Sequence, residues 1–225
     1  MTMMKRKMIA ALIVMVLTAT SSTMLLGDSL GRNFTLFPQE KEIYLEVLDL
    51  LRDNKLPETV VKVNGLIGRN FHSPVYRVIL ATTLFKLEQF EKSAEICQFI
   101  FDMYPIDFKR LRKPGNKNMV APHLYYIQAT SLLNTAQYQE AIAIYKQIIR
   151  SNNYKKPHSS DLKAYALFPK GRKPFYSAVH FDLGIAFLKS GDIPSATKQL
   201  KKLKKYDLVK SLKLKKLITE KTKSA

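Results

Sequence analysis

Residues 125–153 constrain the fold more than any other stretch of this chain. They contain two amphipathic segments, one on each side of a short polar break at residues 134–137. Apolar and small residues recur at steps of three and four along both segments, namely Tyr125, Ala129, Leu132, Tyr138, Ala141, Tyr145 and Ile148. This spacing places one apolar stripe on each of two helices. Two helices this short cannot bury both stripes alone, so similar pairs are expected on either side.

Three further helical pairs are predicted along the chain. They cover residues 39–68, 74–105 and 177–200, with turns at residues 54–55, 88–89 and 190–192. The first apolar residues after the four turns, in chain order, are Leu56, Phe90, Tyr138 and Ile193. The pairs therefore recur at intervals of 34, 48 and 55 residues. The chain is expected to be all-α, a stack of about four helical pairs.

Most of the positive charge lies outside the predicted pairs. The 225 residues carry a formal net charge of +19 at pH 7. Residues 5–7, 106–120, 154–176 and 201–225 carry +3, +4, +5 and +8, so the rest of the chain carries −1. The two internal segments are predicted to be basic inserts, because their lengths are close to the excess of the second and third intervals over the first.

The N-terminal residues have the pattern of an export signal. Three basic residues at positions 5–7 precede an apolar run over residues 8–19, which has about the length of a signal-peptide core. Ala19 and Ser21 then suit a cleavage site, so a signal peptide is predicted over residues 1–22 and a linker over residues 23–38. The alternative is an uncleaved anchor in the inner membrane, since residues 8–27 are uncharged. Either interpretation predicts that the rest of the chain faces the periplasm.

The sequence offers no catalytic or metal-binding constellation. Cys97 is the single cysteine, and its spacing places it among the buried positions of a helix, as an inert thiol. No two of the four histidines are three or four residues apart, as two ligands on one helical face would be. The carboxylates of residues 40–49 follow the outer side of one amphipathic helix. A non-enzymatic protein without cofactor or metal is therefore expected.

The last helical pair resembles the tetratricopeptide repeat family, through Leu183, Gly184, Phe187, Gly191, Ile193, Ala196 and Leu200. That family has small residues at the eighth and twentieth places of a 34-residue unit and large apolar residues at the eleventh and twenty-fourth. Matching residues in the second and third pairs are Ala81, Leu84, Ser93, Cys97, Pro105, Ala129, Leu132, Ala141 and Tyr145. The resemblance covers residues 39–208 and implies a solenoid of antiparallel helical hairpins.

The resemblance also implies a groove lined by the first helix of each repeat, where an extended or helical segment of a partner protein binds. Carried over repeat by repeat, the groove residues are Tyr44, Arg52, Lys86, Tyr126, Thr130, Asn134, Phe181 and Lys189. The polar residues at the helix ends are expected to hold an acidic segment or a C-terminal carboxylate, with apolar contacts from the aromatic rings. Alternatively, the bases end these helices because cations suit the negative end of the helix dipole.

A lysine-rich C-terminal helix over residues 209–225 has three interpretations. Its apolar face, predicted to hold Leu208, Leu212, Leu214, Leu217 and Ile218, suits a cap on the last repeat. The helix could instead lie on an anionic membrane surface, or bind nucleic acid, which export disfavours.

As a whole, the sequence predicts an exported scaffold or adaptor that binds a partner protein in a tetratricopeptide-like groove. The alternative function is binding to an envelope polymer or an anionic membrane surface through the basic inserts and the tail.

Overall fold

The computed structural model describes residues 38–70, 74–103, 120–151 and 172–223, which form helices and the short turns that follow them. The predicted signal peptide and linker, and all of the two inserts except residues 120 and 172–176, lie outside these residues. In chain order the helices are α2 (Pro38–Arg52), α3 (Leu56–Arg69), α4 (Pro74–Lys86), α5 (Phe90–Met103), α7 (Val120–Asn134), α8 (Tyr138–Ser151), α9 (Arg172–Lys189), α10 (Ile193–Leu203) and α11 (Leu208–Lys223). None of the helices in these ranges is long and apolar enough to cross a bilayer.

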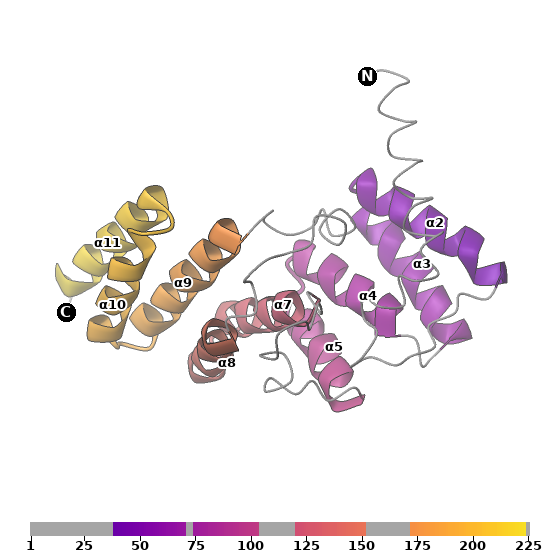
Figure 1. The fold of residues 1–225 in the computed structure, drawn as a ribbon. Helices are drawn as coiled ribbons and strands as arrows, with labels where there is room; N and C mark the ends of the chain where they lie inside the picture. The colour runs from indigo at the N-terminus through magenta and orange to yellow at the C-terminus, as the bar shows by residue number, and fades with distance from the viewer. Residues whose placement is uncertain (1–37, 71–73, 104–119, 152–171, 224–225) are drawn as a thin grey trace, which may run out of the picture.

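Consecutive helices pack in antiparallel pairs, and the pairs follow one another in a row (Figure 1). The pairs are α2 with α3, α4 with α5, α7 with α8, and α9 with α10. The second helix of each pair contacts the first helix of the next, and the first helices α4, α7 and α9 also contact in sequence. The predicted all-α stack of helical hairpins is therefore confirmed for the described residues.

Small residues lie where the helices approach closely. Ala81, Ala129, Ala141 and Ala196 are all fully buried. Ser93 is also fully buried, and its hydroxyl donates a hydrogen bond of 2.9 Å to the backbone oxygen of Ala81. A larger side chain at these positions would separate the helices, so the predicted small residues determine how closely the pairs pack.

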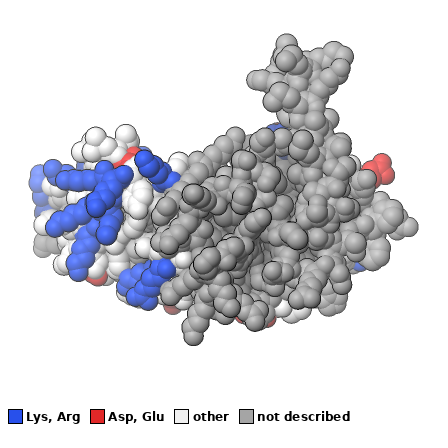
Figure 2. All heavy atoms as spheres, viewed as in Figure 1, with Lys and Arg blue, Asp and Glu red and all other residues white. Residues whose placement is uncertain are grey.

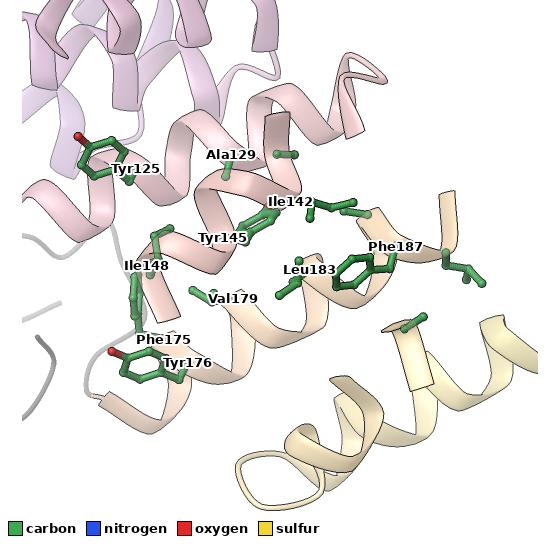
Figure 3. Close-up of a cluster of buried hydrophobic side chains, with 14 residues drawn as sticks. Tyr125, Ala129, Ile142, Tyr145, Ile148, Phe175, Tyr176, Val179, Leu183 and Phe187 are labelled. Carbon is green, nitrogen blue, oxygen red and sulfur yellow. The ribbon is translucent and has the colours of Figure 1, made fainter. Parts of the chain in front are cut away.

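The largest core cluster joins the last two pairs. Tyr145 and Ile148 of α8 meet Phe175, Val179 and Leu183 of α9, as Figure 3 shows. Phe175 is fully buried, although it belongs to the predicted 154–176 insert. Helix α9 begins at Arg172, earlier than the sequence pattern predicts, and therefore includes this buried ring.

One turn conformation closes all four pairs. Each turn contains one residue in the left-handed backbone region. These residues are Asn54, Glu88, Ala136 and Gly191, with φ values of 58°, 58°, 62° and 86°. In each turn the next backbone N–H donates to the carbonyl oxygen five residues earlier, at 2.9, 3.0, 2.9 and 2.8 Å. These are Schellman turns, and they recur at the predicted intervals of 34, 48 and 55 residues. The extra length in the longer intervals therefore falls between pairs, at residues 104–119 and 152–171.

The turn at Ala136 yields a stability prediction. Ala136→Gly should raise the free energy of unfolding by about 0.5–1 kcal/mol, because glycine adopts a positive φ without the clash of a Cβ atom. Ala143→Gly is the matched control in the exposed middle of α8, where glycine should lower stability by about 1 kcal/mol. Urea unfolding followed by circular dichroism measures both, and a loss of stability in both variants would contradict the assigned turn.

Helix α11 occupies the place that the first helix of a further pair would take. It packs against both α9 and α10, with Leu214 fully buried and Ile218 against the large core cluster. The predicted apolar face is wrong in part, because Leu208, Leu212 and Leu217 are 63%, 58% and 36% exposed. Successive helical residues are turned by about 100°, so Leu212 and Leu214 point in nearly opposite directions. The cap therefore uses only one of two apolar sides.

Candidate partner-binding face

The eight predicted site residues lie on α2, α4, α7 and α9, the first helices of the four pairs. Because α7 contacts both α4 and α9, the last three of these helices form one layer. Pairing is antiparallel, so the first helices run in the same direction and their C-terminal ends share one edge of that layer. Lys86, Asn134 and Lys189 each stand at such an end.

The polar residues at the helix ends are all exposed but differ in their bonding. Arg52 forms ion pairs with Asp49 at 2.8 Å and Asp53 at 3.4 Å, so its charge is already compensated. The Asn134 side-chain amide donates to the backbone oxygen of Thr130 at 2.8 Å, which uses one of its two N–H donors. Lys86 and Lys189 make no ion pair with any described residue. Partial burial lowers the pKa of Lys86.

Tyr126 and Thr130 belong to a polar network between the last two pairs. The hydroxyl of Tyr126 donates a hydrogen bond of 2.6 Å to Oδ2 of Asp182 on α9. Its ring lies 6.2 Å from the Tyr145 ring, measured between centroids, and Oγ1 of Thr130 lies 2.8 Å from the Tyr145 hydroxyl. This Tyr126–Asp182 network connects α7, α8 and α9.

Burial changes the proton affinity of the groups in this network. It raises the pKa of the Asp182 carboxyl from 3.8 to about 6, against the opposing effects of the hydrogen bond from Tyr126 and the charge of Lys210. Burial, followed by the charge of Asp182, also raises the pKa of Tyr126 and Tyr145 well above 10. Both phenols therefore keep their protons at neutral pH, while Asp182 changes its charge near pH 6.

Tyr44 and Phe181 are partly buried as well. Tyr44 packs against the core cluster of the first two pairs, and its ring centroid lies 6.2 Å from that of Tyr76. Burial raises the pKa of Tyr44 to about 12. Tyr44 and Tyr126 therefore contribute to packing, whereas the lysines at the helix ends are open to solvent.

The order and packing of the helices have a counterpart of known structure. The MamA RS-1 ArsTM double mutant, a tetratricopeptide-repeat protein, is similar with a TM-score of 0.56 over 84% of this chain and 98% of that chain. This chain has a tetratricopeptide-repeat fold. The two sequences are only 11% identical, so the likeness concerns the fold alone. No protein-family model and no curated protein sequence matches this chain.

Within the tetratricopeptide-repeat fold, the first helices carry the predicted site, but Asp182 was missed by the sequence analysis. A signal was present, because Asp182 is the single acidic residue in the otherwise apolar and basic α9. Among the described residues, no group of three His, Cys, Asp or Glu side chains is placed to hold a metal ion. Cys97 is fully buried, and burial raises the pKa of its thiol, which keeps it protonated.

Proposed function

We propose that this protein is an exported, non-enzymatic scaffold or adaptor that holds a segment of a partner protein on the face formed by its first helices. The tetratricopeptide-repeat fold supports protein binding in general, because stacked hairpins present one long continuous surface. Export to the periplasm is supported by the basic and apolar residues at positions 5–19. A cleaved chain and a chain held by its apolar segment are both compatible with this role.

The observation that carries the proposal is a pair of exposed lysines at one edge of the first-helix layer, neither of which forms an ion pair with a described residue. Lys86 and Lys189 end the helices on either side of α7, and Asn134 ends α7 itself. Two cations with an amide donor between them suit carboxylates, since hydrogen bonds between charged groups are stronger than neutral ones. The proposed partner segment is therefore acidic or ends in a C-terminal carboxylate. The helix dipole also favours cations at these ends, and this effect is compatible with binding.

Reversing these two charges tests the proposal. Lys86→Glu combined with Lys189→Glu should reduce recovery of the bound partner at least about tenfold, because each charged hydrogen bond contributes about 1.5–3 kcal/mol. Recovery is measured by quantitative mass spectrometry after capture of the full chain from its own envelope fraction, with the helical content of each variant checked by circular dichroism.

A matched control distinguishes the effect of the two lysine positions on binding from the effect of the protein's net charge. Lys92→Glu combined with Lys198→Glu makes the same charge change on the second helices α5 and α10, at two exposed positions. If the proposal is correct, the unaltered chain and this control both retain certain partner proteins. The Lys86 and Lys189 variant loses these same proteins. Equal recovery in all three would disprove the site. Equal loss in both variants would favour binding through overall positive charge.

A further inference from the structure

The outer side of α11 carries exposed aliphatic side chains that the cap does not use. Leu208 is 63% exposed, Val209 72% and Leu212 58%. We call these three residues the α11 patch. The other exposed large hydrophobic side chains among the described residues are Val61 at 71%, Met103 at 44%, Tyr206 at 37% and Leu217 at 36%, and of these only Val61 is as exposed as the patch. Clustering of exposed apolar side chains on one short helix marks an interaction surface more strongly than single exposed residues do.

The rotation of α11 explains why the patch has no partner within the described residues. Leu214 is fully buried and Ser211 is 1% exposed, so this side of α11 faces α9 and α10. Residues i, i+1 and i+4 share one side of a helix, which places the α11 patch together in the first turns. The helix thus has two apolar sides, of which one closes the stack and the other faces solvent.

Lysines precede and follow the patch along the chain. Figure 2 shows the basic side chains gathered over the end of the molecule that α10 and α11 form in Figure 1. Residues 201–225 carry a net charge of +8. Lys204, Lys205 and Lys213 are exposed and form no ion pair with a described residue. Any occupant of this surface must therefore present negative charge next to an apolar region.

These properties discriminate between the candidate occupants. A second copy of α11 would bring two strongly positive surfaces together, and like charges without compensation disfavour such contact. A helical peptide partner would need a groove for its apolar side, whereas all three patch residues belong to one helix, α11, which lies at the end of the row of pairs (Figure 1). An anionic bilayer satisfies both needs, because aliphatic side chains enter the acyl boundary and lysines reach the headgroups.

We propose that the α11 patch and its neighbouring lysines dock on an anionic lipid surface. Helix α11 then has two simultaneous roles, since its buried side closes the repeat stack while its outer side rests on the membrane. This surface shares no residue with the proposed partner-binding face. Failure of one proposal therefore leaves the other intact.

The absence of tryptophan from the sequence gives a direct test in the full chain. Leu212→Trp introduces a single indole in the α11 patch. Vesicles containing phosphatidylglycerol should shift its emission to shorter wavelength, and brominated acyl chains should quench it, whereas pure phosphatidylcholine vesicles should do neither. Val61→Trp is the matched control, at a position on α3 that is 71% exposed. Its emission should stay unchanged.

Two sets of substitutions in the Leu212→Trp chain separate the contribution of the lysines to lipid binding from that of the aliphatic side chains. Lys204→Gln, Lys205→Gln and Lys213→Gln together should raise the lipid concentration for half-maximal shift at least about tenfold, because each lysine near an anionic surface contributes about a fivefold factor in affinity. Leu208→Ser with Val209→Ser should raise it by about tenfold or more through lost apolar insertion. Both sets alter exposed positions, so the fold should be retained.

Several outcomes would overturn the proposal. These are no shift with phosphatidylglycerol, an equal shift with phosphatidylcholine, or an equal shift from the Val61→Trp reporter. A shift that appears on raising the protein concentration without vesicles would show a second copy as the occupant. Insertion of the apolar N-terminal segment alone would not produce a shift confined to the Leu212→Trp reporter, because Val61 is closer in sequence to that segment than Leu212 is.

Discussion

Leu214→Ala is expected to lower the free energy of unfolding by about 2–5 kcal/mol, the usual cost of truncating a leucine in a packed core. Leu214 is fully buried where α11 covers the end of the stack. Leu212→Ala is the control on the same helix, at a position that is 58% exposed, and should change stability by less than about 0.5 kcal/mol. Urea unfolding measures both variants. Similar losses from the two would contradict the packing of α11.

Gly184→Ala extends this test, because its effect on the free energy of unfolding should change sign when Leu214 is truncated. A Cβ atom at Gly184 would lie 2.5 and 3.2 Å from the two terminal carbons of Leu214, so Gly184→Ala should cost about 1–2 kcal/mol by overpacking. In the Leu214→Ala chain the obstruction is gone, and Gly184→Ala should instead stabilise by about 1 kcal/mol through helix propensity. The same sign in both chains would show that α9 and α11 do not meet at these residues.

Asp182→Asn is expected to raise the free energy of unfolding by about 2 kcal/mol at pH 8 and to have almost no effect near pH 4. Burial raises the pKa of Asp182 from 3.8 to about 6. As the pH rises between these values, the unfolded chain releases the proton that the folded chain retains, so stability falls. Above pH 6 the folded chain keeps a buried carboxylate at a constant cost. Asparagine removes that charge and still accepts the hydrogen bond from Tyr126.

The measurement is the difference in unfolding free energy between the two chains at pH 4 and pH 8, because the difference cancels all other titrating groups. Asp207 gives a control in which stability depends on pH in the opposite direction. Hydrogen bonding from the backbone of Lys210 is the first cause that lowers the pKa of Asp207, so its stabilising effect is present at neutral pH and lost on acidification. An Asp182→Asn effect of equal size at both pH values would show that Asp182 does not retain its proton in the folded chain.

The repeat architecture was predictable because its signals are local. Apolar stripes, small residues such as Ala81 and Ala129, and the position of each turn all depend on neighbours within one helical pair. The intervals between turns then located the inserts without any knowledge of distant contacts. Helix α11 was predicted as a helix for the same reason. Which of its two apolar sides packs inward depends on α9 and α10, so the sequence pattern combined them into one face.

The candidate site was predictable only in part, for the same physical reason. Lys86 and Lys189 are exposed ends of first helices, as the repeat pattern predicts. Tyr126 is different, because its hydrogen-bond partner Asp182 lies 56 residues further along the chain. A pattern within α7 does not reveal that contact. The sequence of α9 singles out Asp182 as an acidic residue, but its raised pKa became evident only from the packing of the two repeats side by side.

The contact between α8 and α9 has a consequence for how the molecule unfolds. Each unit of a linear repeat array is stabilised by its immediate neighbours, so a break between two units would yield halves that melt separately. Residues 152–171 interrupt the sequence between α8 and α9, yet one core cluster and the Tyr126–Asp182 bond cross that point. The repeats on either side are therefore thermodynamically coupled, and we expect their slowest-exchanging amide protons to report one common opening reaction.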